Sequence, residues 1–232
     1  MSQTPILTPA KAYALWAPHY PAQAHNPVMR AEERAMLALM PAGMHGQTVL
    51  DAGCGSGRYM LHALSRGAAR VKGVDLSVQM LQYAAMALRE HRSQAEVSLV
   101  QGSLEALPTP DAWADLTVCG LVIGHLDDLQ QALAELSRVT RPGGTLLCSD
   151  VHPIGHALGW LRDFKCDGQR YAVRHKAHRY SHWHAACANL GLEIERVLEP
   201  MLDPDDIPAE AHFDPRALDV PVALVFQLRR AP

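Results

Sequence analysis

The stretch VLDAGCGSGRY, residues 49–59, places three glycines within five positions directly after a short apolar run. The apolar run predicts a buried strand, and the residues after Gly57 predict a helix. Glycine lets the chain turn sharply between the two and lets a ligand approach the bare backbone. The start of the helix adds free N–H groups and the positive end of the helix dipole. We interpret the stretch as a ligand-binding turn, because a turn without a ligand usually needs only one glycine.

The residues around the turn indicate which ligand it suits. GCGSG differs from the GxGxxG of dinucleotide-binding turns and from a P-loop, which continues with Lys and Ser or Thr. Asp51 precedes the turn, where a carboxylate suits an ammonium group better than a pyrophosphate. Asp75 ends the next predicted strand, where a carboxylate accepts hydrogen bonds from ribose hydroxyls. The two carboxylates together predict an adenosine with a cationic amino-acid tail.

Strands alternate with helices along most of the chain, which is typical of an α/β fold with parallel βαβ units and helices on both faces. The predicted strands are 48–53, 70–77, 96–103, 114–123, 144–152, 192–200 and 219–230, with a turn at RPGG (141–144). The last two strands follow one another without a helical crossover. This indicates that the last strand is antiparallel to the others.

Two segments fall outside this alternation. Residues 1–45 begin with a stretch rich in Pro, Ala, His and aromatic residues, and we predict an arm and a helix there. We assign the main domain to residues 46–232. Within it, residues 151–180 are rich in His and Arg and too polar for a core. We expect this segment to form the acceptor site over the carboxyl ends of the strands, where open α/β sheets bind ligands.

Composition excludes several classes of partner. The 232 residues carry a net charge of −3, with a pI near 6.5, so a broadly basic nucleic-acid surface is absent. The five cysteines contain no C-x-x-C pair, which favours reduced thiols. We find no signal peptide and no apolar stretch of membrane-spanning length. We therefore expect a cytoplasmic protein that binds neither nucleic acid nor membrane, with an oligomeric state that the sequence leaves open.

The segments VLDAGCGSGRY, GVDLS, VQGSLEALP, ADLTVCGLVIGHL and RVTRPGGTLLCSD occur in the order seen in class I S-adenosylmethionine-dependent methyltransferases. Across about residues 48–150 the chain resembles the small-molecule branch of that family, with a layout similar to ubiquinone/menaquinone, malonyl-carrier-protein and natural-product methyltransferases. The resemblance implies a Rossmann-like, doubly wound sheet of seven strands, mostly parallel, with an antiparallel last strand. It also implies an enzyme that uses S-adenosyl-L-methionine and releases S-adenosyl-L-homocysteine.

The resemblance assigns cofactor contacts to the residues that follow the strands. Those around the methionine and sulfonium are Asp51, Gly53, Cys54, Gly55, Cys119, Gly120 and Leu121. Those around the ribose and adenine are Asp75, Leu76, Met80, Gly102, Ser103 and Leu104. For Leu76, Leu104 and Leu121, plain core packing is the alternative interpretation.

Methyl transfer needs alignment of the acceptor and exclusion of water, and a general base only where the attacking atom is protonated. His125, after the fourth strand, is the candidate base or positioning residue, and the alternative is a histidine that bonds loop backbone. Candidate acceptor contacts are Tyr13, Trp16 and Tyr20 of the arm, which would act as a lid, and His152 and His156. The arm aromatics have simple packing as their alternative. We expect no metal site.

Three functions fit these observations. The leading one is methyl transfer to oxygen, nitrogen or carbon of a small metabolite, including an aromatic or heteroaromatic one. The second is methylation of a carboxyl group on a carrier-bound acyl chain, which needs a surface for an acidic partner. Residues suited to that surface are Arg162, Arg170, Arg174, Lys176 and Arg179. The third is a module that binds the cofactor without catalysis.

Overall fold

The apolar run before the glycine turn forms a fully buried strand, β2 (Thr48–Ala52), inside a seven-stranded sheet. The structure is a computed structural model that describes residues 4–91, 93–207 and 213–232. Across the sheet the strands follow the order β4-β3-β2-β5-β6-β10-β9. The other strands are β3 (Arg70–Asp75), β4 (Glu96–Gln101), β5 (Ala114–Gly120), β6 (Thr140–Val151), β9 (Leu192–Leu198) and β10 (Ala223–Arg230).

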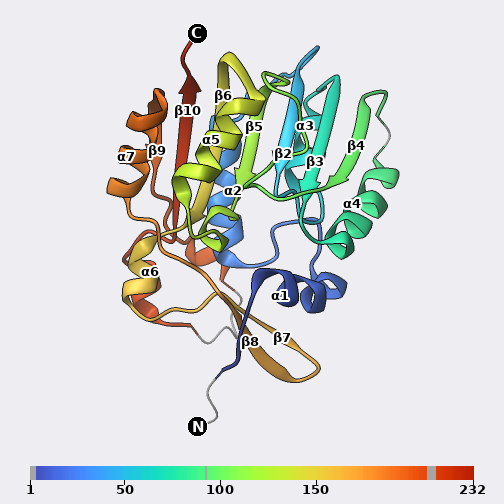
Figure 1. The fold of residues 1–232 in the computed structure, drawn as a ribbon. Helices are drawn as coiled ribbons and strands as arrows, with labels where there is room; N and C mark the ends of the chain where they lie inside the picture. Colours follow the sequence, from blue (N-terminus) through green and yellow to red (C-terminus); the bar gives the residue numbers. More distant parts are fainter. Residues whose placement is uncertain (1–3, 92, 208–212) are drawn as a thin grey trace.

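The sheet is parallel except for its last strand. β2 runs parallel to β3 and β5, while β4 and β6 continue the parallel pairing on either side. β10 pairs antiparallel with both β6 and β9, so β9 points the same way as the parallel strands. The predicted Rossmann-like sheet with an antiparallel last strand is confirmed (Figure 1).

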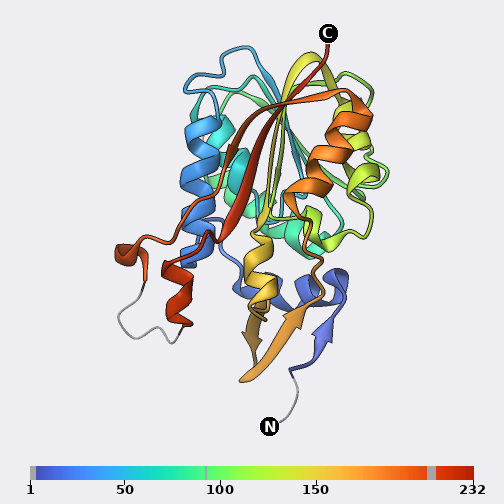
Figure 2. The same ribbon diagram turned by 90° about the vertical axis from the view of Figure 1, so that its left-hand side faces the viewer.

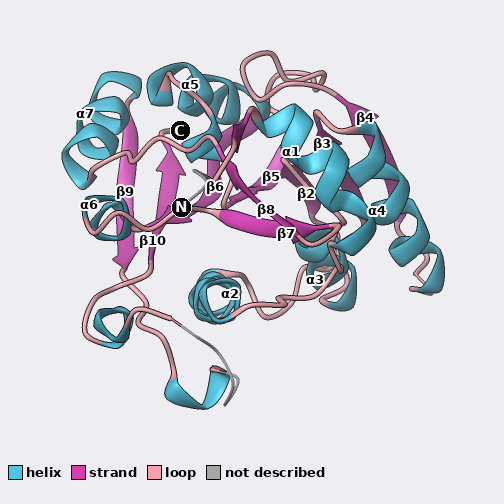
Figure 3. Cartoon of the chain, turned by 90° about the horizontal axis from the view of Figure 1, so that it is seen from below, coloured by secondary structure: helices cyan, strands magenta, loops and turns pink. Residues whose placement is uncertain are grey.

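Helices cover both faces of the sheet. Figure 3 shows α5 (Leu129–Val139) and α7 (Tyr180–Leu190) on one face, and α2 (Pro27–Leu39) and α3 (Arg58–Ser65) on the other. Leu81 and Leu88 of α4 (Val78–Glu90) pack against the cluster that α2 and α3 share with the sheet. Ser77 caps α4, because its hydroxyl accepts the N–H of Met80.

The fifth predicted strand is longer than the sequence indicates. β6 begins at Thr140, so the RPGG turn lies inside the strand, and Gly143 has φ +68°. The pairing register between β5 and β6 shifts at this point. A glycine in the left-handed region lets the strand bend without ending it.

The remaining segments gather at the carboxyl ends of the parallel strands. Figures 1 and 2 show α1 (Pro9–Trp16), α6 (Pro153–Ala157) and the hairpin of β7 (Asp163–Cys166) and β8 (Gln169–Val173) at this edge. β1 (Ile6–Leu7) pairs parallel with β8, which makes a small three-stranded sheet that we did not predict. This small sheet fixes the arm against the segment expected to hold the acceptor.

None of the helices in the described ranges is long and apolar enough to cross a membrane.

Candidate functional site

The glycine turn requires glycine for two different reasons. Gly53, Gly55 and Gly57 all have positive φ, at +78°, +53° and +92°. A Cβ on Gly53 would also lie 2.5 Å from Val122, so the turn packs tightly against the loop after β5. A Cβ on Gly55 would meet nothing within 4 Å, and that open space belongs to a cavity. The turn is therefore both a tight bend and one wall of a binding site.

A cavity of about 300 Å³ lies between the glycine turn, the ends of the central strands and the arm. It brings together most of the predicted site residues: Tyr13, Tyr20, Gly53, Gly55, Asp75, Leu76, Met80, Gly102, Ser103, Leu104, Gly120, Leu121 and His125. Asp51 and Cys54 line a smaller space of about 40 Å³ on the other side of the turn, together with Tyr20 and Arg58. The two spaces share Tyr20, Gly53, Gly55 and Gly120.

Four predicted residues lie elsewhere. Trp16 stacks on Phe164, with ring centroids 4.8 Å apart, and so fixes α1 on the hairpin. Cys119 is buried in the core. His152 caps α6, with Nδ1 accepting the N–H of Ile154 and Nε2 lying 3.1 Å from Glu199. His156 lines a separate outer groove.

Asp51 carries an unsatisfied acceptor. Its side chain is 1% exposed, and Oδ2 has no hydrogen-bond partner among the described residues. Burial raises the pKa of this carboxyl to about 7. A buried polar atom without a partner is costly unless a ligand satisfies it. An ammonium group in the neighbouring space would do so, which is what the sequence predicts for the ligand.

Asp75 joins the end of β3 to the glycine turn. Its Oδ2 accepts the N–H of Gly55 at 2.8 Å, and its Oδ1 accepts the N–H of Ser77 at 2.8 Å. Burial raises its pKa, and the two backbone N–H groups oppose that shift. A carboxylate offers about four acceptor positions, so both oxygens keep capacity for ribose hydroxyls. Asp75 therefore fits the predicted ribose contact while holding the turn in place.

The arm reaches the site through Tyr13. Its hydroxyl lies 2.9 Å from Nε2 of His125, whose Nδ1 lies 3.2 Å from the carbonyl of Arg174. Since the carbonyl accepts only, Nδ1 carries the proton and Nε2 accepts the Tyr13 O–H. Burial lowers the pKa of His125 to about 3 and raises the pKa of Tyr13. Both groups are therefore neutral, and the lone pair on Nε2 of His125 accepts the Tyr13 hydroxyl instead of facing the cavity as a base.

Arg162 places a positive charge on the cavity wall. Its guanidinium donates to the carbonyl of Leu121 at 2.7 Å and lies 6.0 Å from the ring centroid of Tyr13. Leu121 has φ +58°, a conformation that few side-chain-bearing residues adopt. Among the described residues no carboxylate forms an ion pair with Arg162. The cavity wall therefore carries a cation that makes no direct ion pair within the described ranges, although, against the effect of burial, the buried carboxylates of Asp150 and Glu32 lie near enough to raise its pKa.

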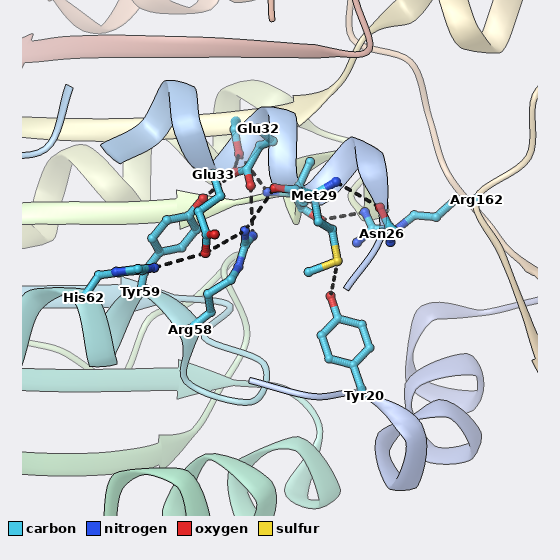
Figure 4. A network of polar contacts seen from close by, with 11 residues as sticks. Tyr20, Asn26, Met29, Glu32, Glu33, Arg58, Tyr59, His62 and Arg162 are labelled. Atoms are coloured by element: carbon cyan, nitrogen blue, oxygen red, sulfur yellow. Dashed lines mark hydrogen bonds and ion pairs between the residues drawn. The ribbon is translucent and has the colours of Figure 1, made fainter. Parts of the chain in front are cut away.

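A buried ionic network behind the turn was missed by sequence reasoning. Fully buried Glu32 of α2 accepts from Arg58 at 2.9 Å and from Tyr59 at 2.7 Å, as Figure 4 shows. It also accepts from the hydroxyl of Ser149 in β6. Arg58 lies 3.6 Å from Glu33 as well. The position of Arg58 directly after GSG was the one local signal that this side chain lies beside the turn.

Within the part of the chain that the structure describes, no group of three His, Cys, Asp or Glu side chains is arranged to hold a metal ion.

The fold and the site define an α/β nucleoside-binding protein. A doubly wound sheet ends in a glycine turn, with an unsatisfied buried carboxylate on one side and a carboxylate suited to ribose on the other. These features fit S-adenosylmethionine, which combines an adenosine with a methionine ammonium group.

Comparison with known proteins gives the family. Residues 50–148 match the family described as "Methyltransferase domain". A malonyl-[acyl-carrier protein] O-methyltransferase of Enterobacter lignolyticus is 40% identical over 137 residues, which cover 59% of this chain and 51% of that protein. A protein of the same name from Pectobacterium atrosepticum is 38% identical over 181 residues, covering 77% and 66%. The chain thus spans about half to two thirds of these relatives.

A solved S-adenosylmethionine-dependent methyltransferase from Mesorhizobium loti has a TM-score of 0.68 and 26% identity, covering 86% of this chain and 98% of that one. The chain belongs to the class I S-adenosylmethionine-dependent methyltransferases. The predicted family and cofactor are confirmed.

Proposed function

We propose that this chain methylates the carboxylate of an acyl group. The observation that carries the proposal is Arg162, a cation on the cavity wall that forms no direct ion pair with a carboxylate among the described residues. A guanidinium binds a carboxylate through two parallel hydrogen bonds, which fixes its orientation as well as its position. The relatives named for a malonyl group support the same acceptor, since malonyl carries a free carboxylate.

The reaction asks the protein mainly for alignment. When bound, S-adenosylmethionine supplies a methyl group on a sulfonium; an acceptor oxygen bonds to that carbon while the C–S bond breaks and its electron pair stays on sulfur. Asp51 and Asp75 hold the two ends of the cofactor, and Arg162 holds the acceptor. The aromatic side chains of the arm cover the cavity and keep water out.

A carboxylate acceptor removes the need for a general base. Carboxyl groups ionise at a pH of about 4, so the attacking oxygen carries its charge at neutral pH. His125 is neutral, and its lone pair accepts the Tyr13 hydroxyl. We therefore assign His125 as a positioning residue that holds the arm, rather than as the base.

We extend the proposal to the domain assignment and to the location. Residues 4–45 act as a lid, supported by the contacts of Tyr13 with His125 and of Trp16 with Phe164. A reducing, cytoplasmic compartment is supported by five free cysteines, four of them buried.

The proposal is tested with two matched thioesters, malonyl and its terminal amide, offered with methyl-labelled cofactor. We expect label in the malonyl product only, and at least a tenfold lower kcat/KM for Arg162→Gln. Arg170→Gln on the same hairpin serves as the control, because Arg170 pairs with Asp163 away from the cavity. Equal labelling of the amide, or an unaffected Arg162→Gln enzyme, would contradict a carboxylate acceptor and favour a small metabolite instead.

A further inference from the structure

The segment between β8 and α7 is bonded to the loop after β5. Four contacts join the two segments, and each of them ends on a backbone carbonyl. They are His125 Nδ1 to the Arg174 carbonyl at 3.2 Å, the Lys176 N–H to the Gly124 carbonyl at 2.7 Å, Lys176 Nζ to the Asp127 carbonyl at 2.6 Å, and His178 Nε2 to the Leu126 carbonyl at 3.2 Å. Residues 174–178, the clamp, therefore hold residues 121–127, the cavity loop, which lines the cavity.

A buried pair of side chains fastens the clamp to the sheet. Nε2 of His175, in the middle of the clamp, lies 2.9 Å from Oδ1 of Asp150 in β6, and both side chains are less than a tenth exposed. Burial by itself would raise the pKa of Asp150, but the hydrogen bond with His175 and nearby positive charge lower it. The carboxylate is therefore ionised and only accepts, so Nε2 of His175 is the donor.

The cavity loop packs against this pair through a glycine. A Cβ on Gly124 would overlap the His175 ring and would lie 2.5 Å from Oδ2 of Asp150. Oδ2 is buried and has no hydrogen-bond partner among the described residues. A buried acceptor without a partner lowers stability, so the close approach of the loop costs free energy. Such a cost is typical of places where function fixes the geometry.

Two contacts of the site depend on where the cavity loop lies. The Leu121 carbonyl accepts from Arg162 at 2.7 Å, although Leu121 has φ +58°. The His125 ring bonds the Tyr13 hydroxyl and lies nearly perpendicular to the His175 ring, with centroids 5.7 Å apart. A shift of the loop would therefore move both the cation for the acceptor and the anchor of the arm.

We propose, on the basis of the carboxylate acceptor argued above, that Asp150 and His175 form a positioning pair for the acceptor side of the site. Neither side chain belongs to the lining of the cavity in the described ranges, so the pair acts through the cavity loop and not on the acceptor. The pair fixes the clamp on the sheet, and the clamp fixes the loop where it holds Arg162 and Tyr13. Without the pair, clamp and loop would move together away from the strand ends.

The test uses two variants of one residue. His175→Leu has nearly the same volume but no donor for Asp150, whereas His175→Gln keeps an N–H group. We expect His175→Leu to lower kcat/KM for a malonyl thioester about tenfold, because small displacements from the reactive geometry slow transfer strongly. Amide hydrogen exchange, followed by mass spectrometry on the complex with S-adenosylhomocysteine, should quicken in the cavity loop and in α1. Affinity for S-adenosylhomocysteine should change little, since Asp51 and Asp75 lie on other strands.

His175→Gln should restore most of the rate and of the protection from exchange. His182→Gln is the matched control, because His182 is an exposed histidine of α7 whose side chain bonds Arg179. We expect the control to behave as the unmodified enzyme does. Thermal unfolding of each variant separates a local effect from a loss of the whole fold.

The outcomes distinguish this inference from the acceptor on which it rests. Unchanged exchange in α1 and the cavity loop of His175→Leu would overturn the positioning pair. Faster exchange throughout the chain, with a lower unfolding temperature and no rescue by His175→Gln, would also overturn it and leave a merely structural pair. If the unmodified enzyme forms no methyl ester, the carboxylate acceptor is contradicted, and the exchange measurement still decides whether the pair holds the loop and the arm.

Discussion

The Tyr13 hydroxyl and the His125 imidazole, 112 positions apart in the sequence, form a hydrogen bond of 2.9 Å. This bond joins the N-terminal arm to the loop after β5, beside the glycine turn. Tyr13 of the arm therefore lines the cavity and also bonds His125, which lies in the same loop as Leu121. The Tyr13–His125 hydrogen bond therefore couples the position of the arm over the cavity to the position of the loop that lines the acceptor site.

Tyr13→Phe should weaken the closed arm. The variant keeps the ring but loses the hydroxyl, and a hydrogen bond of this kind contributes about 0.5–1.5 kcal/mol. We expect the KM for the acceptor to rise about two- to tenfold and backbone amides of α1 to exchange faster with solvent. Tyr171→Phe is the matched control, because its hydroxyl bonds Gln169 away from the cavity. Unchanged exchange and KM would show that the bond does not hold the arm.

Asp75→Asn should reduce affinity for S-adenosylhomocysteine by about 1–3 kcal/mol, the scale of leaving paired polar groups unsatisfied. Calorimetric titration measures this directly. Asp111→Asn, a surface change in an exposed ion pair with Arg138, should leave the affinity unaltered. An unaltered affinity in Asp75→Asn would rule out the ribose contact.

Asp51 should make cofactor affinity depend on pH. Its pKa is raised to about 7, so the carboxyl is partly protonated near neutrality and binds an ammonium best when ionised. Affinity measured by titration should therefore rise between about pH 6 and 8. Asp51→Asn should bind more weakly and lose that slope, whereas a slope that persists in the variant would assign it to another group.

The Asp51 carboxyl should make the stability of the ligand-free protein fall with rising pH, whereas cofactor affinity rises. A folded-state pKa above the unfolded value means that the folded protein binds the proton more tightly. The ligand-free protein should therefore lose stability as the pH rises from about 4 to 7. Denaturant unfolding of Asp51→Asn should show a smaller loss over this window, and an equal loss would contradict the assignment.

Removal of Glu32 should destabilise the fold strongly. Glu32→Ala leaves Arg58 buried without its closest counterion, a change that costs about 3–5 kcal/mol when a buried pair is broken. Glu33→Ala is the comparison, since Glu33 is partly exposed and lies farther from Arg58. Urea unfolding midpoints compare the two, and similar midpoints would mean that the network contributes little.

Local signals in the sequence predicted the parts of the site that local chemistry determines. The glycine turn, Asp51 and Asp75 lie at strand ends, where an apolar run followed by a turn fixes their place. The antiparallel β10 follows from the absence of an α-helical crossover among the described residues between β9 and β10. The hairpin of β7 and β8 also had a sequence signal, the dipeptide Asp167-Gly168, which is typical of a two-residue type I′ turn. In the structure both residues have the positive φ that this turn type requires.

Long-range contacts between side chains could not be predicted in this way. Glu32 meets Arg58 from another helix, and Tyr13 meets His125 across half the chain. The hydrophobic periodicity of the sequence does not predict such pairs, because each residue fits the pattern of its own helix or loop and nothing local identifies its partner. Arg162 was noted only as part of a basic surface, and its place in the cavity depends on how the hairpin packs against Leu121.

The most direct test of the proposed chemistry is to locate the transferred methyl group. Malonyl thioester is incubated with cofactor carrying a ¹³C-labelled methyl, and the product is examined by carbon NMR. A carboxylate held at Arg162 predicts a single labelled methyl ester with the thioester intact. Label on carbon, or no labelled product from this acceptor while another small molecule is methylated, would contradict the account.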